Sequence, residues 1–129
     1  MVIVYIEDDP DQVSLFKTII AKFSKLTVLP AFNVPDGKRL LSRKCGRVKC
    51  VVMDLSLDGA QEFGGLAEGM GLLDWIKETY PAVPVLVLTG HSEMAEPIQD
   101  KYPDVEVHIK ASESVEKLAR SIEAVAGVA

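Results

Sequence analysis

The amino-acid sequence predicts one α/β domain, built as a doubly wound five-stranded parallel sheet with helices on both faces. Two observations support this prediction. Short apolar runs alternate with amphipathic segments along the chain, which indicates parallel strands joined by helical crossovers. Most of these runs are nearly uninterrupted and rich in β-branched residues, which is typical of strands buried on both faces.

Five apolar runs are predicted to be strands, and the second has a special feature. It contains Pro30, which cannot donate a hydrogen bond to a neighbouring strand, so we expect that strand at an edge of the sheet. The last run alternates apolar and polar residues, unlike the others. The predicted strands cover residues 2–6, 27–32, 48–53, 83–88 and 105–109.

The segments between the strands are predicted to be helices. Asp9 followed by Pro10 is typical of a helix start with Asp as the N-cap. Pro97 predicts that one of the later helices is short or kinked. Residues 59–71, which contain five glycines, are predicted to be a long flexible loop. The helices after the first are expected over residues 35–43, 71–80, 93–102 and 112–125.

Length and composition limit the possible functions. The 129 residues fit one domain spanning 1–129, and 48% hydrophobic residues can form a core. The net charge of -5 argues against direct nucleic-acid binding, and no apolar run is long enough to span a membrane. Two cysteines form no disulfide framework, so we expect reduced thiols in a cytoplasmic protein. The chain leaves no room for a DNA-binding module, although a fragment of a longer protein stays an open alternative.

Polar residues follow four of the predicted strands, where ligands bind in open parallel sheets. Carboxylates that meet at one sheet edge repel each other, and a divalent cation such as Mg²⁺ relieves that repulsion. The polar residues at the strand ends are Glu7, Asp8 and Asp9 after the first, Asp54 after the third, Thr89, Gly90 and His91 after the fourth, and Lys110 after the fifth.

Asp54 is the candidate nucleophile, because it follows an apolar strand that would hold its carboxylate rigidly at the rim. A carboxylate can attack phosphorus and form an acyl phosphate, with a metal ion neutralising charge on the transferred group. Lys110 and the hydroxyl of Thr89 could each bind a phosphoryl oxygen. Asp9 is left out of this site, because it is expected to cap the helix that follows it.

The same residues carry a family resemblance. The pieces Val-Tyr-Ile-Glu7-Asp8-Asp9, Val-Val-Met-Asp54-Leu, Val-Leu-Thr89-Gly90 and Ile-Lys110 each follow the expected strand in the expected order. Over essentially its whole length, the chain resembles the receiver domains of two-component response regulators, which have a flavodoxin-like fold. Four such pieces in register are much more specific than one.

The resemblance implies a role for each matching residue. Asp54 matches the phosphoacceptor, Thr89 the hydroxyl residue that moves toward the phosphoryl group, and Lys110 the family's lysine. Asp8 would be a direct ligand of Mg²⁺ or Mn²⁺, Glu7 would act through water, and the backbone carbonyl of Ser56 would complete the protein's share of the metal shell.

The resemblance also implies partners. The phosphoryl group would come from a phosphohistidine on a sensor histidine kinase or on a histidine phosphotransfer protein of a phosphorelay. The modified domain would signal by binding a downstream protein target, without direct contact to nucleic acid or membrane. It would not be an enzyme, apart from catalysing its own phosphorylation and dephosphorylation.

Several positions depart from the family pattern. Asp58 replaces a common proline, Val107 replaces an aromatic residue, and Ala111 replaces the proline after the lysine. The segment through Gly71 is roughly nine residues longer than usual and could gate the site or contact a specific kinase. These departures leave a second hypothesis open, a pseudo-receiver that binds proteins without phosphorylation. A haloacid-dehalogenase-type phosphatase is disfavoured, because Ser56 occupies the position of that family's second aspartate.

Overall fold

The computed structural model describes residues 2–7, 9–23, 25–44, 46–54, 65–89, 93, 95–109, 117, 120–122 and 124. Its strands form one sheet of five, in the order β2-β1-β3-β4-β5, and each pair of neighbouring strands is parallel. This is the predicted doubly wound α/β architecture. The strands are β1 (Val2–Ile6), β2 (Thr27–Ala31), β3 (Val48–Asp54), β4 (Val85–Thr89) and β5 (Glu106–Ile109).

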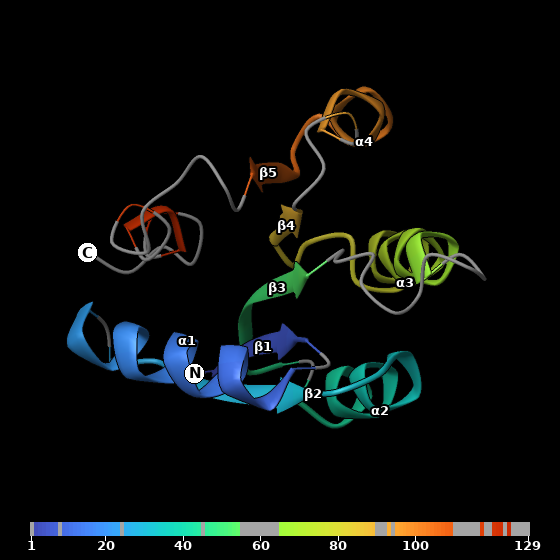
Figure 1. Cartoon of the computed structure of the whole chain (residues 1–129). Helices are drawn as coiled ribbons and strands as arrows, with labels where there is room; N and C mark the ends of the chain where they lie inside the picture. The colour runs from blue at the N-terminus through green and yellow to red at the C-terminus, as the bar shows by residue number, and fades with distance from the viewer. Residues whose placement is uncertain are drawn as a thin grey trace.

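Helices lie against both faces of the sheet (Figure 1). On one side, α1 (Pro10–Phe23) contributes Val13, Phe16 and Ile20 to a core with Ile3 and Tyr5 of β1. On the other side, α2 (Val34–Lys44), α3 (Gly65–Thr79) and α4 (Ala95–Lys101) pack on a second core that includes the alternate residues of the same strands. Because successive side chains along a strand point to opposite faces of the sheet, β1 and β3 contribute residues to both cores.

The edge position predicted for β2 is confirmed. Strand β2 is the first in the sheet order, and Pro30 lies opposite Tyr5 in its pairing with β1. The short fourth helix is confirmed as well, because α4 has seven residues and contains Pro97 in its first turn. At these two places the restrictions that proline imposes on the backbone are visible in the structure.

The start of α3 was predicted wrongly. The glycine-rich segment 59–71 was expected to be a loop, but α3 begins at Gly65 and therefore includes Gly69 and Gly71. Each glycine disfavours a helix by about 1 kcal/mol, yet packing of the helix onto the core can outweigh this preference. Leu72, Leu73 and Ile76 on this helix are fully buried. Residues 59–64 lie outside the described part of the chain.

The helix predicted over residues 112–125 is described at only a few positions. The residues described there, at 117, 120–122 and 124, have helical conformation. Ile122 is buried in the same core as α1, which agrees with its predicted inward position. The rest of this segment lies outside the described residues.

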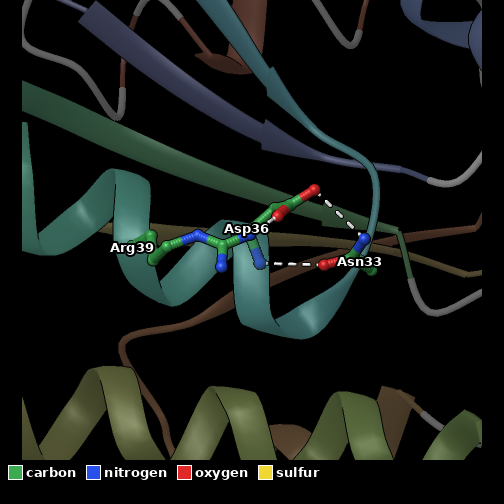
Figure 2. Close-up of polar contacts among 3 residues, drawn as sticks. All are labelled: Asn33, Asp36 and Arg39. Carbon is green, nitrogen blue, oxygen red and sulfur yellow. Dashed lines mark hydrogen bonds and ion pairs between the residues drawn. The ribbon is translucent and has the colours of Figure 1, made fainter.

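The start of α2 is fixed by side-chain caps (Figure 2). The side chain of Asn33 accepts a hydrogen bond from the backbone N–H of Asp36 at 2.8 Å and donates one to the Asp36 carboxylate at 3.1 Å. The first bond satisfies the Asp36 N–H, which has no partner within the helix, and the second holds the Asn33 side chain in place. The same carboxylate pairs with Arg39 one turn later.

A glycine lets α2 approach β1 closely. A Cβ atom added at Gly37 would lie 3.2 Å from the Cδ1 atom of Ile6, which is a tight contact. Ile6 is the last residue of β1 and directly precedes Glu7. The helix therefore packs immediately beneath the end of the strand that leads into the candidate site.

Among the described residues, no helix is both long and apolar enough to cross a membrane.

Replacement of the α2 cap tests this account of the helix start. We expect Asn33→Ala to lower the free energy of unfolding by about 1 kcal/mol, because the N–H of Asp36 loses its acceptor. Urea unfolding followed by circular dichroism measures this change. Asn33→Ser should retain most of the stability, and an alanine variant as stable as the wild type would show that the cap is unimportant.

Candidate functional site

The carboxyl ends of three adjacent strands form one rim of the sheet. Ile6 of β1 lies opposite Met53 of β3, so Glu7 and Asp54 follow at neighbouring positions. Asp54 in turn lies opposite Leu88 of β4, the residue before Thr89. The register of the parallel strands thus brings Glu7, Asp54 and Thr89 together at the rim formed by the carboxyl ends of the strands, as the sequence predicted.

Glu7 is held by the backbone around it. Its N–H donates to the carbonyl of Ala31 at 2.9 Å, which extends the pairing of β1 with β2 by one residue. Its Oε1 atom accepts a hydrogen bond from the N–H of Asp9 at 3.2 Å. The residue is only 4% exposed, which is unusual for a glutamate.

Asp54 and Thr89 complete the described part of the rim. Asp54 is half-buried, and its Oδ1 atom, like the Oε2 atom of Glu7, is shielded from solvent. Thr89 ends β4 and is completely buried. It lies opposite Ile109 of β5, the residue that precedes Lys110 in the sequence. Burial limits the rotamers of these groups and so fixes their orientation.

Three predicted site residues lie outside the described part of the chain. They are Asp8, the backbone carbonyl of Ser56, and Lys110. Their neighbours Glu7, Asp54 and Ile109 are described and stand at the rim. The roles expected of these three residues therefore stay predictions.

The described donors suit a hard divalent cation. Two carboxylates contribute buried oxygen atoms at one sheet edge, and Mg²⁺ prefers oxygen ligands of this kind. Among the described residues, no group of three His, Cys, Asp or Glu side chains is placed to hold a metal ion. Glu7 and Asp54 alone do not form a complete set of protein ligands for a metal ion. Such a set would also need the predicted contributions of Asp8 and Ser56.

Tyr5 is a polar neighbour of the rim that the sequence prediction missed. It was interpreted only as part of an apolar strand, and its ring is indeed buried in the core. Burial raises the pKa of its hydroxyl far above the usual range, and the charges of Glu7 and Asp54 and a hydrogen bond with Glu7 raise it further. The available signal was a hydroxyl two residues before Glu7, on the same strand face.

Comparison with known proteins gives a consistent result. Residues 3–123 match the family model of the response regulator receiver domain. An NtrX-like response regulator of Rickettsia bellii is 30% identical over 88 residues, which is 68% of this chain and 17% of that protein. The matched region therefore spans less than a fifth of the length of this relative.

Solved structures share the fold. A response regulator receiver domain protein from Clostridium thermocellum has a TM-score of 0.75 at 21% identity, covering 97% of this chain and 93% of its own. The receiver domain of NtrX from Brucella abortus has a TM-score of 0.76 at 19% identity, covering 98% of this chain and 99% of its own. These likenesses confirm the predicted flavodoxin-like arrangement of strands and helices.

Removal of one buried charge should stabilise the protein without metal. We expect Glu7→Gln to raise the free energy of unfolding in EDTA by about 1 kcal/mol, because a buried carboxylate loses hydration and lies beside a second acidic group. The Gln side chain can still accept from the N–H of Asp9. Urea unfolding measures the change.

Glu78→Gln is the matched control, because it makes the same chemical change on an exposed surface of α3. It should alter the stability by less than about 0.5 kcal/mol. If Glu7→Gln unfolded at a lower urea concentration than the wild type, the electrostatic cost assigned to the buried Glu7 carboxylate would be wrong.

Proposed function

Because the chain belongs to the family of response regulator receiver domains, we propose that Asp54 accepts a phosphoryl group in a Mg²⁺-dependent reaction. The observation that carries the proposal is the position of Asp54, which ends buried strand β3 at the rim, next to the strand ends that bear Glu7 and Thr89. A nucleophile held in this way loses little freedom when the phosphorus atom approaches.

The reaction would transfer a phosphoryl group from a phosphohistidine to Asp54. A carboxylate oxygen of Asp54 forms a bond to phosphorus, the phosphorus–nitrogen bond breaks, and the electron pair returns to the donor imidazole. A bound Mg²⁺ would neutralise negative charge on the phosphoryl oxygens. Glu7, Asp8 and the carbonyl of Ser56 are the proposed residues that, with Asp54, hold it.

Two further residues would bind the transferred group. The hydroxyl of Thr89 is proposed to donate to one phosphoryl oxygen, in keeping with its buried position at the end of β4. The Lys110 ammonium is proposed to pair with another, because Lys110 follows the strand beside β4. Because the phosphoryl group stays on Asp54, the domain would act as a signalling module and not as an enzyme with an external product.

The proposed setting is a two-component system or a phosphorelay. A sensor histidine kinase or a histidine phosphotransfer protein would supply the phosphoryl group, and a downstream protein would bind the modified domain. We place this exchange in the cytoplasm, and we propose that residues 1–129 form one receiver domain. Direct contact with nucleic acid or membrane is not part of the proposal.

One observation favours a second candidate, a pseudo-receiver that binds proteins without phosphorylation. Val107 of β5 packs on the core shared by α2, α3 and α4, at a position where the family resemblance implies an aromatic side chain. A phosphorylation signal that depends on reorientation of that aromatic ring cannot operate with valine. The preserved acceptor at Asp54 makes this candidate the weaker of the two.

Phosphorylation by a small-molecule donor separates the two candidates. With Mg²⁺ and a phosphodonor such as acetyl phosphate, we expect the wild type to gain the mass of one phosphoryl group, and hydroxylamine to remove it. Asp54→Asn should gain none, and EDTA should abolish the gain. Intact-protein mass spectrometry measures each result.

Asp100→Asn serves as the control, since it removes an exposed aspartate of α4 away from the rim. It should be phosphorylated like the wild type. A wild-type protein that neither gains the adduct nor binds Mg²⁺ would support the pseudo-receiver instead, and continuous turnover of a phosphate ester would indicate a phosphatase.

A further inference from the structure

The site contains a buried hydroxyl that the proposed phosphoryl transfer does not use. Tyr5 is the last residue but one of β1 and is 2% exposed. Its ring packs against Phe16 of α1, with ring centroids 4.1 Å apart and an interplanar angle of 33°. This contact fixes the ring between the sheet and the helix, so the direction of the hydroxyl is determined by the fold.

The hydroxyl lies beside the two carboxylates of the rim. Side chains two residues apart on a strand share a face, so Tyr5 and Glu7 project toward the same side of the sheet. Tyr5 also lies opposite Val52 of β3, two residues before Asp54. The influence of Glu7 and Asp54 on the pKa of Tyr5, together with the hydrogen bond to Glu7, agrees with this proximity.

A tyrosine in this place has an energetic consequence for Glu7. A buried carboxylate is costly unless it accepts hydrogen bonds, and a buried phenol needs an acceptor for its own proton. The Asp9 N–H already donates to one oxygen of Glu7. A second donor from the core side would restrict the carboxylate to one orientation at the rim.

We propose that Tyr5 is a positioning residue, whose hydroxyl donates to Glu7 and orients this carboxylate for the divalent cation. This inference rests on the proposed function, because it assigns a partner to a residue of the proposed metal shell. Groups that hydrogen-bond metal-binding residues typically change metal affinity by 10-fold to 100-fold when they are removed. Tyr5 would not contact the cation or the phosphoryl group.

Tyr5→Phe is the direct test, because it removes the hydroxyl and keeps the ring that packs on Phe16. We expect the Kd for Mg²⁺ of the unphosphorylated protein to rise about 10-fold. Two-dimensional NMR of the full chain during a MgCl₂ titration measures this Kd and also reports whether the variant is folded.

Tyr102→Phe is a matched control. The Tyr102 hydroxyl also donates to a carboxylate, that of Asp74, which in turn pairs with Lys101 at 2.9 Å. This pair joins α3 to the end of α4, and neither residue belongs to the rim. Tyr102→Phe should therefore leave the Kd for Mg²⁺ within about 2-fold of the wild-type value.

A double-mutant cycle distinguishes positioning from a general effect on the fold. If the hydroxyl acts through Glu7, Tyr5→Phe should change the Kd by less than about 2-fold in a Glu7→Gln background. A purely structural residue would have the same effect in both backgrounds.

If Tyr5→Phe does not fold, wild-type protein labelled with ¹³C at the tyrosine Cζ atoms gives an independent measurement. Mg²⁺ should then shift the Tyr5 resonance and leave that of Tyr102 in place.

The outcomes separate this inference from the proposed function. If the wild type binds Mg²⁺ and Tyr5→Phe binds it equally well, the role of Tyr5 is refuted while the proposed function stands. An equal loss of affinity in the Glu7→Gln background, or an unmoved Tyr5 resonance, also refutes it. If the wild type does not bind Mg²⁺, both proposals fail.

Discussion

The parallel pairing of β3 with β1 and β4 is the constraint on which the rest of the structure depends. It brings polar residues that are far apart in the sequence to one rim, where Glu7, Asp54 and Thr89 follow or end neighbouring strands. Two carboxylates held together with little exposure are unfavourable by themselves. The helices on both faces of the sheet bury apolar side chains, and this apolar burial offsets the cost. Gly37 contributes because it allows α2 to pack closely against Ile6, the last residue of β1.

Much of the fold could be predicted from the sequence because the local signals agree with the tertiary structure. The apolar runs, the Asp9-Pro10 helix start and the proline in β2 all indicate their observed positions. The start of α3 could not be predicted in this way. Glycine disfavours a helix through backbone entropy, which is a local effect. The burial of Leu72, Leu73 and Ile76 favours the helix, but this burial depends on the assembled sheet and is not visible in the local sequence.

The candidate site also contains residues that could be predicted from the sequence and one that could not. Glu7, Asp54 and Thr89 could be predicted because each stands at a strand end, and the alternation of strands and helices indicates parallel strands whose carboxyl ends lie on one side of the sheet. The position of Tyr5 beside the site could not be predicted, because a tyrosine within an apolar run indicates a core residue. Its ring does lie in the core. The hydrogen bond with Glu7, the influence of the Asp54 charge and the register with β3 place its hydroxyl beside the acidic rim. Asp8, Ser56 and Lys110 stand outside this comparison, as they lie outside the described residues.

The two edges of the sheet carry residues that oppose growth by strand addition. Pro30 interrupts the donors of β2 at one edge, and the exposed carboxylate of Glu106 lies on β5 at the other. An incoming strand would lose a backbone hydrogen bond at the first and meet a charge at the second. Lateral aggregation of the sheet through β2 or β5 is thereby discouraged.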